Sequence, residues 1–324
     1  MKRRWPVGAI VVTGLAVGVI VVEAAPAEIT SSASATKPAV RLHPPGPHIG
    51  GCQVFPGDNP WNQEIASAPL HPLSAQIINH IQAIGGDNLH PDFGENQSYG
   101  IPYVVVPVDQ PLVPITYDAY GDESDPGPFP IPFDAPVEGG GDAHVLVVQE
   151  QTCQLFELFA AHRSGGGWIA GSGARFDLSS GALRPLGWTS ADAAGLPILP
   201  GLVRYDEVAA GAIDHAIRVT FSRTQRGFVL PATHFASSDP DPTLPAMGMR
   251  IRLRADFDLN TLGGQARVIA AAMQRYGLIV ADNGSNWFFQ GAPDPGWNDE
   301  DLSQLKSIPG TAFEVVDTGP VRTG

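Results

Sequence analysis

The densest group of side chains able to move protons lies between residues 184 and 215. Carboxylates, an imidazole and arginines occur there among glycines and prolines, which hold a loop in a fixed shape. Acid–base catalysis needs a proton donor and an acceptor close to the reacting group, and a cation where negative charge develops. We therefore predict that this segment lines the principal cleft and converges there with His234. The predicted catalytic residues are Asp192, Arg204, Asp206, Glu207, His215 and His234.

Each of these side chains also has a structural alternative. His215 begins a predicted strand on its apolar side, where a neutral histidine can be hydrogen-bonded inside the core. Arg204 can pair with Asp192 or Glu207, and Asp206 can cap a short helix. The residue types therefore predict a site, but they leave open which side chains meet.

Aromatic side chains offer a second kind of contact, because sugar rings stack on them as other apolar faces do. Trp188, Tyr205 and Trp287 are the predicted substrate-binding residues. The alternative is that the tryptophans fill the core, which this residue type does equally well.

Charged residues outside the segment have similar alternatives. Glu157 lies within an apolar strand, where burial would raise the pKa of its carboxyl, as a general acid requires, or a salt bridge would hold it. Arg250, Arg252 and Arg254 share one strand face, which we predict to be a solvated outer face balanced by neighbouring aspartates.

Known catalytic signatures are missing from the sequence. It contains no G-x-S-x-G, H-E-x-x-H, P-loop or G-x-G-x-x-G motif, which disfavours α/β-hydrolases, zinc proteases, and nucleotide- or dinucleotide-binding enzymes. The oxygen-rich loops 122–125 and 282–287 lack EF-hand spacing, so we predict ordinary turns there. We expect neither a metal nor a cofactor.

Strands must position most of these residues. Glycine (37 residues) and proline (31 residues) punctuate the whole chain, which favours short strands joined by turns. Apolar and polar residues alternate over 249–257 and 213–221, as in strands that cover a core on one side. Further strands are predicted at 103–106, 144–148, 155–159, 228–230, 278–281, 287–290 and 313–316, with 144–148 and 155–159 as a hairpin.

Helices are fewer. Apolar periodicity predicts helices over 74–84 and 262–276, each stopped by glycine, and capping by Asn298 predicts a third over 299–306. The whole predicts a β-rich α+β fold, with antiparallel sheets in a sandwich or jelly-roll-like arrangement and about three flanking helices.

The N-terminus has the order of a secretory signal peptide: basic residues, a short apolar run, then small residues. The apolar run over residues 7–22 is shorter than the roughly 20 residues of a membrane span, although an uncleaved anchor is the alternative. We expect a signal peptide over 1–27, a flexible Ser/Ala/Pro-rich tether over 28–50, one globular β-rich domain over 51–317 and a disordered tail over 318–324. The mature chain would then be secreted, periplasmic or on the cell surface.

The chain has two cysteines, Cys52 and Cys153, which is consistent with a location outside the cytoplasm. In an oxidising compartment a single pair most simply forms one disulfide, and two buried free thiols are the alternative. There is no C-x-x-C motif, so neither zinc–cysteine nor thioredoxin-type chemistry is indicated.

The chain is acidic, with a net charge of −14 at pH 7. Removing the leader takes away three basic residues and one acid, which makes the charge more negative. An acidic chain does not seek phosphate backbones, so we expect no nucleic-acid partner. After signal cleavage we also expect no membrane partner, and we expect a monomer.

Four segments resemble those of a widespread group of exported bacterial proteins. They are ESDPGPFPIP (123–132), GWTSADAAGLPILPGLVRYDEV (187–208), HFASSDPDPTLPAMGMRIRL (234–253) and YGLIVADNGSNWFFQGAPDP (276–295). The resemblance spans about residues 53–317 and implies a bacterial, exported, single-domain protein. It implies no activity.

Two classes of function remain. The first is an extracellular carbohydrate-active enzyme that acts on a polysaccharide by hydrolysis or β-elimination. The second is a non-catalytic module that binds a polysaccharide or a cell-surface glycan. A cleft holding the acids, the histidines and Arg204 together would favour the enzyme, and a flat tryptophan platform would favour the binding module.

The leader generates the first prediction. Mass spectrometry of protein secreted by its native host should show an N-terminus at or near Glu28. Recovery of only the intact Met1 form, in the membrane fraction, would contradict cleavage.

Overall fold

A computed structural model describes residues 47–86 and 88–323. The predicted signal peptide and most of the predicted tether lie outside the described residues. None of the helices in the described ranges combines the length and the apolar content that a membrane span requires.

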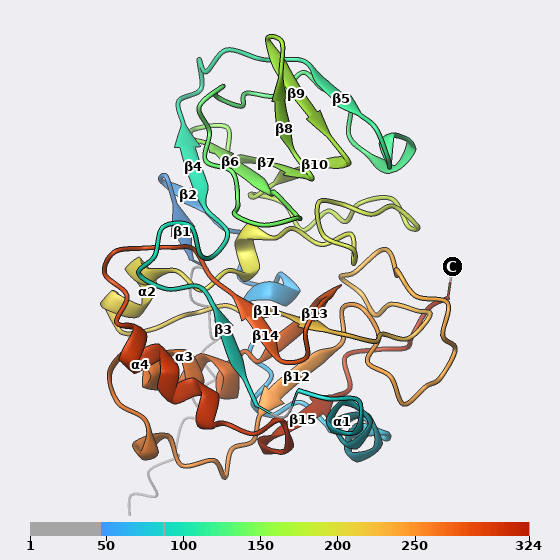
Figure 1. Cartoon of the computed structure of the whole chain (residues 1–324). Coiled ribbons are helices and arrows are strands. Elements are labelled where there is room, and N and C mark those ends of the chain that lie inside the picture. The colour runs from blue at the N-terminus through green and yellow to red at the C-terminus, as the bar shows by residue number, and fades with distance from the viewer. Residues whose placement is uncertain (1–46, 87, 324) are drawn as a thin grey trace, which may run out of the picture. The chain divides into compact units, whose positions relative to one another are not determined.

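Residues 103–177 form two sheets at the top of Figure 1. In the four-stranded sheet the outer strand β4 is parallel to β6, and the other neighbours are antiparallel. Its order is β10 (Ser172–Asp177), β7 (Gln154–Phe159), β6 (Val145–Gln149) and β4 (Tyr103–Val106). The three-stranded sheet has the order β5 (Ile115–Tyr117), β9 (Gly167–Ala170) and β8 (His162–Ser164).

The four-stranded sheet is buried on both faces. Successive side chains of a strand point to opposite faces, so the residues of β6 divide between two cores. Val145 and Val147 join a small core between the two upper sheets, whereas Leu146 and Val148 join the large core of the molecule. This explains why 144–148 and 155–159 are apolar throughout, and their predicted hairpin is confirmed.

A six-stranded mixed sheet lies below. Strand β11 is parallel to β13, and β14 is parallel to β3, while the other neighbours are antiparallel. The order is β15 (Phe313–Val316), β12 (Arg250–Leu253), β13 (Leu278–Asn283), β11 (Ile217–Phe221), β14 (Phe288–Gln290) and β3 (His90–Asp92). A two-stranded ribbon, β1 (His48–Ile49) with β2 (Cys52–Gln53), begins the described chain.

Four α-helices in the described ranges flank the six-stranded sheet (Figure 1). Helix α1 packs on β15, and α3 packs on β12 and contacts α2 and α4. The apolar periodicity predicts α1 and α3 correctly, and the side chain of Asn298 caps α4 as expected. The helices are α1 (Ser74–Ala83), α2 (Tyr205–Ala210), α3 (Gly264–Arg275) and α4 (Asp299–Gln304).

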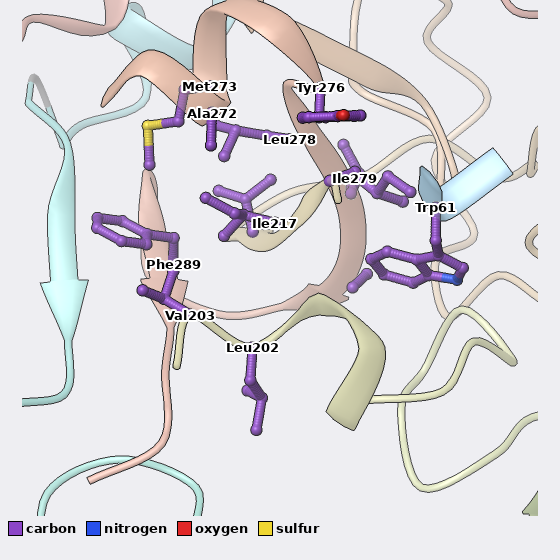
Figure 2. Packing of buried hydrophobic residues seen from close by; sticks show 14 of the residues in the cluster. Trp61, Leu202, Val203, Ile217, Ala272, Met273, Tyr276, Leu278, Ile279 and Phe289 are labelled. Atoms are coloured by element: carbon purple, nitrogen blue, oxygen red, sulfur yellow. The ribbon is translucent and has the colours of Figure 1, made fainter. Parts of the chain in front are cut away.

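The large core lies between this sheet and its helices. Figure 2 shows Ile217 of β11 among apolar side chains from α3, β13 and β14. Burying a side chain of this size contributes about 1.5–3 kcal/mol to the free energy of unfolding, so this packing stabilises the position of β11. The buried neighbours labelled there include Ala272, Met273, Leu278, Ile279 and Phe289.

The predicted fold class, a β-rich α+β sandwich-like fold, is confirmed. Two details differ: two of the sheets are mixed rather than purely antiparallel, and residues 47–86 and 88–323 contain four α-helices where about three are predicted. Parallel neighbours need long connections between them, and the alternation within a strand carries no information about its partner's direction.

The predicted arginine face is not an open surface. Arg250 is buried and donates to the carbonyl oxygen of Pro60 at 2.6 Å, and Arg252 pairs with Glu314 at 2.8 Å. The segment 60–68 covers this face, because the arginines supply donors to its free carbonyl groups. Arg254 alone behaves as predicted, with a 3.0 Å ion pair to Asp256 near the surface.

Both predicted boundaries of the domain shift outward. His48 and Ile49, which fall within the expected tether, pair with β2. At the other end Arg322 exchanges two backbone hydrogen bonds with Phe228, so the expected disordered tail is partly ordered.

The predicted Cys52–Cys153 disulfide is confirmed, with 5.4 Å between the two Cα atoms. It joins β2 to the turn between β6 and β7. The bond therefore ties the beginning of the described chain to the four-stranded sheet.

Removing this bond should destabilise the fold. The cysteines are 101 residues apart, and opening such a loop restores chain entropy to the unfolded state worth about 4–5 kcal/mol. A variant carrying both Cys52→Ser and Cys153→Ser should lose that much free energy of unfolding, measured by urea denaturation. An unchanged urea midpoint would show that the disulfide does not stabilise the fold through loop entropy.

Candidate active site

The predicted catalytic residues divide into two groups. Arg204, Asp206, Glu207 and His215 gather at the start of α2, whereas Asp192 and His234 line a different cavity. The predicted convergence of the whole segment 184–215 with His234 is therefore wrong.

The group at α2 is largely a buried ion-pair cluster. Nη2 of Arg204 lies 2.8 Å from one carboxylate oxygen of Glu207, and Nε2 of His215 lies 3.1 Å from the other. His215 is 0% exposed, and its Nδ1 lies 2.7 Å from the carbonyl oxygen of Ala216. A sealed imidazole with both nitrogens engaged cannot reach a substrate, so His215 is a structural residue of the core. Asp206 is largely exposed, and its Oδ1 lies 3.4 Å from Nε of Arg204.

The group around Asp192 lines what we call the Asp282 cleft. It consists of two adjoining cavities of about 240 Å³ each, which share Asp142, Asp282 and Asn283 in their walls. The first cavity adds Tyr120, Phe159, Ser172, Thr189, Ser190, Asp192 and His234. The second adds Asp92, Ile101, Glu138, His144, Arg218, Thr220, Phe288 and Gln290.

An ion pair between Asp192 and Arg218 connects the two cavities. Arg218 approaches both carboxylate oxygens of Asp192, through Nη2 at 2.8 Å and Nε at 3.3 Å, and its Nη1 donates to Gln290 at 2.7 Å. Ile217 and Val219 of β11 point into the core, so the pleat turns Arg218 to the opposite face, into the cleft. The strand thus fixes the cation of the site.

Asp192 and Asp282 line the same cavity, and the carboxyl group of Asp282 acts electrostatically on that of Asp192. Like charges placed close together repel, which favours a proton on one of two neighbouring carboxyl groups. Burial raises the pKa of Asp192 well above its ordinary value, Arg218 opposes this shift, and Asp282 adds to it. Asp282 sits in β13 and is only half-buried, so it is the member of the pair that faces the cleft.

A second pair, Glu138 and His144, stands beside Arg218 in the cleft wall. Oε2 of Glu138 lies 2.5 Å from Nδ1 of His144, whose Nε2 lies 3.1 Å from the carbonyl oxygen of Ala191. With an acceptor at each nitrogen, the ring is held in its doubly protonated form. Burial lowers the pKa of His144, but the hydrogen bond and charge of Glu138 outweigh it and the net pKa is raised.

The pKa of Glu138 shifts the opposite way. Burial raises it, but the hydrogen bond and charge of His144 outweigh burial, so the pKa of Glu138 is lowered. Both shifts favour the charged pair over a wide pH range around neutrality.

Glu157, considered above as a general acid, holds the backbone of a loop instead of facing a cleft. Its carboxylate is fully buried and accepts the backbone N–H groups of Ile198 and Leu199 at 2.9–3.0 Å. Burial raises the pKa of Glu157 to about 7, although these two N–H groups lower it. The contact fixes the 184–215 loop on β7 and so holds Asp192 in place.

His234 stands at the rim of the first cavity. Its Nδ1 lies 2.7 Å from the carbonyl oxygen of Ala193, and its Nε2 lies 3.9 Å from a carboxylate oxygen of Glu123. A quarter of the side chain is exposed, so His234 remains a candidate for proton transfer or for substrate contact.

The three predicted substrate-binding aromatic residues lie in three different places. Trp287 is 0% exposed and packs in the core against Phe221 and Phe313, so it cannot stack on a ligand. Trp188 is half-buried beside the guanidinium of Arg184 and does not line the Asp282 cleft. Tyr205 lines a third cavity, described below.

Several residues of the cleft escape sequence reasoning. Arg218 and Thr220 alternate with apolar residues and therefore predict a solvated face, yet β11 is a central strand and both are buried. Asp282 falls in a segment predicted to be an ordinary turn. The available signal is that Thr220 lies near the end of one predicted strand and Asp282 directly follows another, and the parallel pairing of β11 with β13 places the two residues opposite each other.

No group of three or more His, Cys, Asp or Glu side chains in residues 47–86 and 88–323 is arranged to hold a metal ion. Comparisons with protein-family models, with curated proteins and with solved structures give no match for this chain. The site must therefore be interpreted from its own chemistry.

The Glu138–His144 pair generates a pH-dependent prediction. Replacing Glu138 by Gln keeps a hydrogen-bond acceptor but removes its charge, so burial dominates and the pKa of His144 should fall. The parent gains stability from this histidine at low pH and loses that gain as pH rises through the raised pKa, and the variant should lack that dependence. NMR titration of the ring signals measures both forms.

Glu123→Gln is the matched control, because Glu123 lies beside His234. It should leave the His144 titration unchanged. If Glu138→Gln also leaves it unchanged, the pair is not what charges His144.

Proposed function

We propose that this chain is an extracellular hydrolase that cleaves a neutral polysaccharide in the Asp282 cleft. The observation that carries the proposal is the pair of carboxyl groups, buried Asp192 and half-buried Asp282, that line the same cavity where the two cavities adjoin. Burial raises the pKa of Asp192, which favours retention of an acidic proton at this place.

The lining residues can be given roles in a hydrolysis. Asp282, the member of the pair that faces the cleft, is the general acid: it gives a proton to the glycosidic oxygen as the bond from that oxygen to the anomeric carbon breaks. A water oxygen bonds to the anomeric carbon and gives its proton to Asp142, the other carboxylate that both cavities share. Arg218 remains bound to Asp192 and stabilises the negative charge left on the pair.

The charges of the cleft support a neutral substrate and hydrolysis rather than β-elimination. Elimination acts on sugars that carry a carboxylate, which an arginine must hold. Within the cleft Arg218 is bound to Asp192, and the carboxylates of Asp92 and Asp142 would repel an anionic sugar. Hydroxyl groups, by contrast, find acceptors and donors along the whole lining.

The alternative function, a non-catalytic glycan-binding module, has less support. That function needs exposed aromatic side chains, and four of the five tryptophans in the described ranges are buried: Trp61, Trp168, Trp287 and Trp297. A polar cleft with a pair of neighbouring carboxyl groups suits catalysis better than a stacking platform.

Asp282→Asn tests the proposal. The mature protein should release new reducing ends from at least one neutral polysaccharide in a panel, without unsaturated products. The variant should lose about a hundredfold or more in kcat, the usual contribution of general acid–base catalysis, with little change in thermal midpoint. In the parent, kcat/KM should fall at high pH as the pair loses its proton and at low pH as the second carboxylate gains one.

Asp256→Asn is the matched control, because Asp256 is an exposed aspartate paired with Arg254 outside the cleft. It should keep the activity of the parent. Full activity of Asp282→Asn would refute the assigned role, and binding of a polymer without any cleavage would replace the hydrolase by the binding module.

A further inference from the structure

A third cavity, which we call the Arg204 cavity, lies beside the start of α2. Its volume is about 620 Å³, more than either cavity of the Asp282 cleft. Two tyrosines and three prolines supply apolar surface, and one cation and two carboxylates supply polar contacts. The residues used below are Tyr103, Arg204, Tyr205, Asp206 and Asp294.

Arg204 is incompletely satisfied within the protein. Its side chain is 2% exposed; Nη2 binds Glu207 and Nε faces the carboxylate of Asp206 at 3.4 Å, but Nη1 is buried without a hydrogen-bond acceptor in the described chain. A buried donor without a partner costs about 1–3 kcal/mol, and native proteins rarely keep one without a function. Because Arg204 lines the cavity, a ligand bound there can supply the acceptor.

The chemistry of the wall selects the ligand. A guanidinium only donates hydrogen bonds and carboxylates only accept them, so a group that does both satisfies them together, as a hydroxyl does. The carboxylates of Asp206 and Asp294 would repel an anionic ligand, and the guanidinium of Arg204 would repel a cationic one. The rings of Tyr103 and Tyr205 offer flat faces to the C–H surface of a sugar. Burial raises the pKa of Tyr103, which keeps its hydroxyl a donor.

The same three segments of chain build this cavity and the Asp282 cleft. Ile101, Glu138 and Gln290 line the cleft, and the residues that follow or precede them within two positions line the Arg204 cavity. Consecutive Cα atoms are 3.8 Å apart, so in each segment the backbone of the two linings lies within about one or two residue lengths. A ligand that reaches both sites would pass around these shared segments.

We propose that the Arg204 cavity is a distal subsite that binds a neutral sugar unit of the polysaccharide whose scissile bond lies in the Asp282 cleft. The inference rests on the proposed function for the identity of the polymer. It implies an enzyme that prefers long chains to short ones.

Binding can be measured apart from cleavage. Isothermal titration of the full mature Asp282→Asn protein should detect a neutral hexasaccharide from a panel built of glucose, xylose, mannose or N-acetylglucosamine. Adding Asp294→Ala should weaken that binding roughly tenfold, because one hydrogen bond to a charged group is lost, and should leave the thermal midpoint unchanged. Asp206→Ala, at a largely exposed side chain, is a second variant with the same expected result.

Adding Asp256→Ala is the matched control and should leave the affinity unchanged. Equal affinity after both Asp294→Ala and Asp206→Ala, binding of acidic oligogalacturonides instead, or no binding of any neutral hexasaccharide would each overturn the subsite. Reducing-end assays on polymers separate the two proposals. If the parent hydrolyses a polymer while the distal variants leave its KM unchanged, the subsite alone fails; if a hexasaccharide binds and nothing is cleaved, the hydrolase alone fails.

Discussion

The buried ion pair between Asp192 and Arg218 is the contact on which the cleft depends. Two charges removed from water cost several kcal/mol each, and only close pairing with further hydrogen bonds offsets that cost. Gln290 satisfies a third N–H of Arg218, and Asp282 accepts the backbone N–H of Ala193, next to Asp192. The pair thereby joins β11, β13, β14 and the 184–215 loop, and losing one partner would leave an uncompensated charge costing about 3–5 kcal/mol.

The loop that carries Asp192 is held from above by the four-stranded sheet. Glu157 on β7 accepts N–H groups from Ile198 and Leu199, and His144 bonds to the carbonyl group of Ala191. These contacts place polar groups of one sheet against the backbone of a loop that lies on the other. The functional geometry therefore comes from irregular chain fixed at several buried points, which is how loops achieve the precision that catalysis needs.

Local signals in the sequence predict local structure well here. The helices α1 and α3, strands such as β4 and β15, the β6–β7 hairpin and the disulfide all follow from periodicity, capping or residue count. Pairing between distant strands does not, because alternation reveals which face is apolar but not what covers the other. For that reason the alternation places Arg218 on a solvated face. Residue type places His215 and Arg204 in a cleft, whereas in the structure Glu207 binds both. Residue type identified acids and bases, and only the fold could show which of them meet.

The four-stranded sheet has a further consequence for motion. Because β6 contributes alternate residues to both cores, neither the upper sheets nor the lower sheet can lose its packing without exposing apolar surface of the other. Heat and denaturant should therefore melt the described domain in a single cooperative step, without a stable half-unfolded form. If the proposed polymer binds, its entry would not depend on one half of the domain separating from the other. It would rely on movements of side chains and short loops at the rim of the Asp282 cleft, and the buried groups beneath would keep their positions.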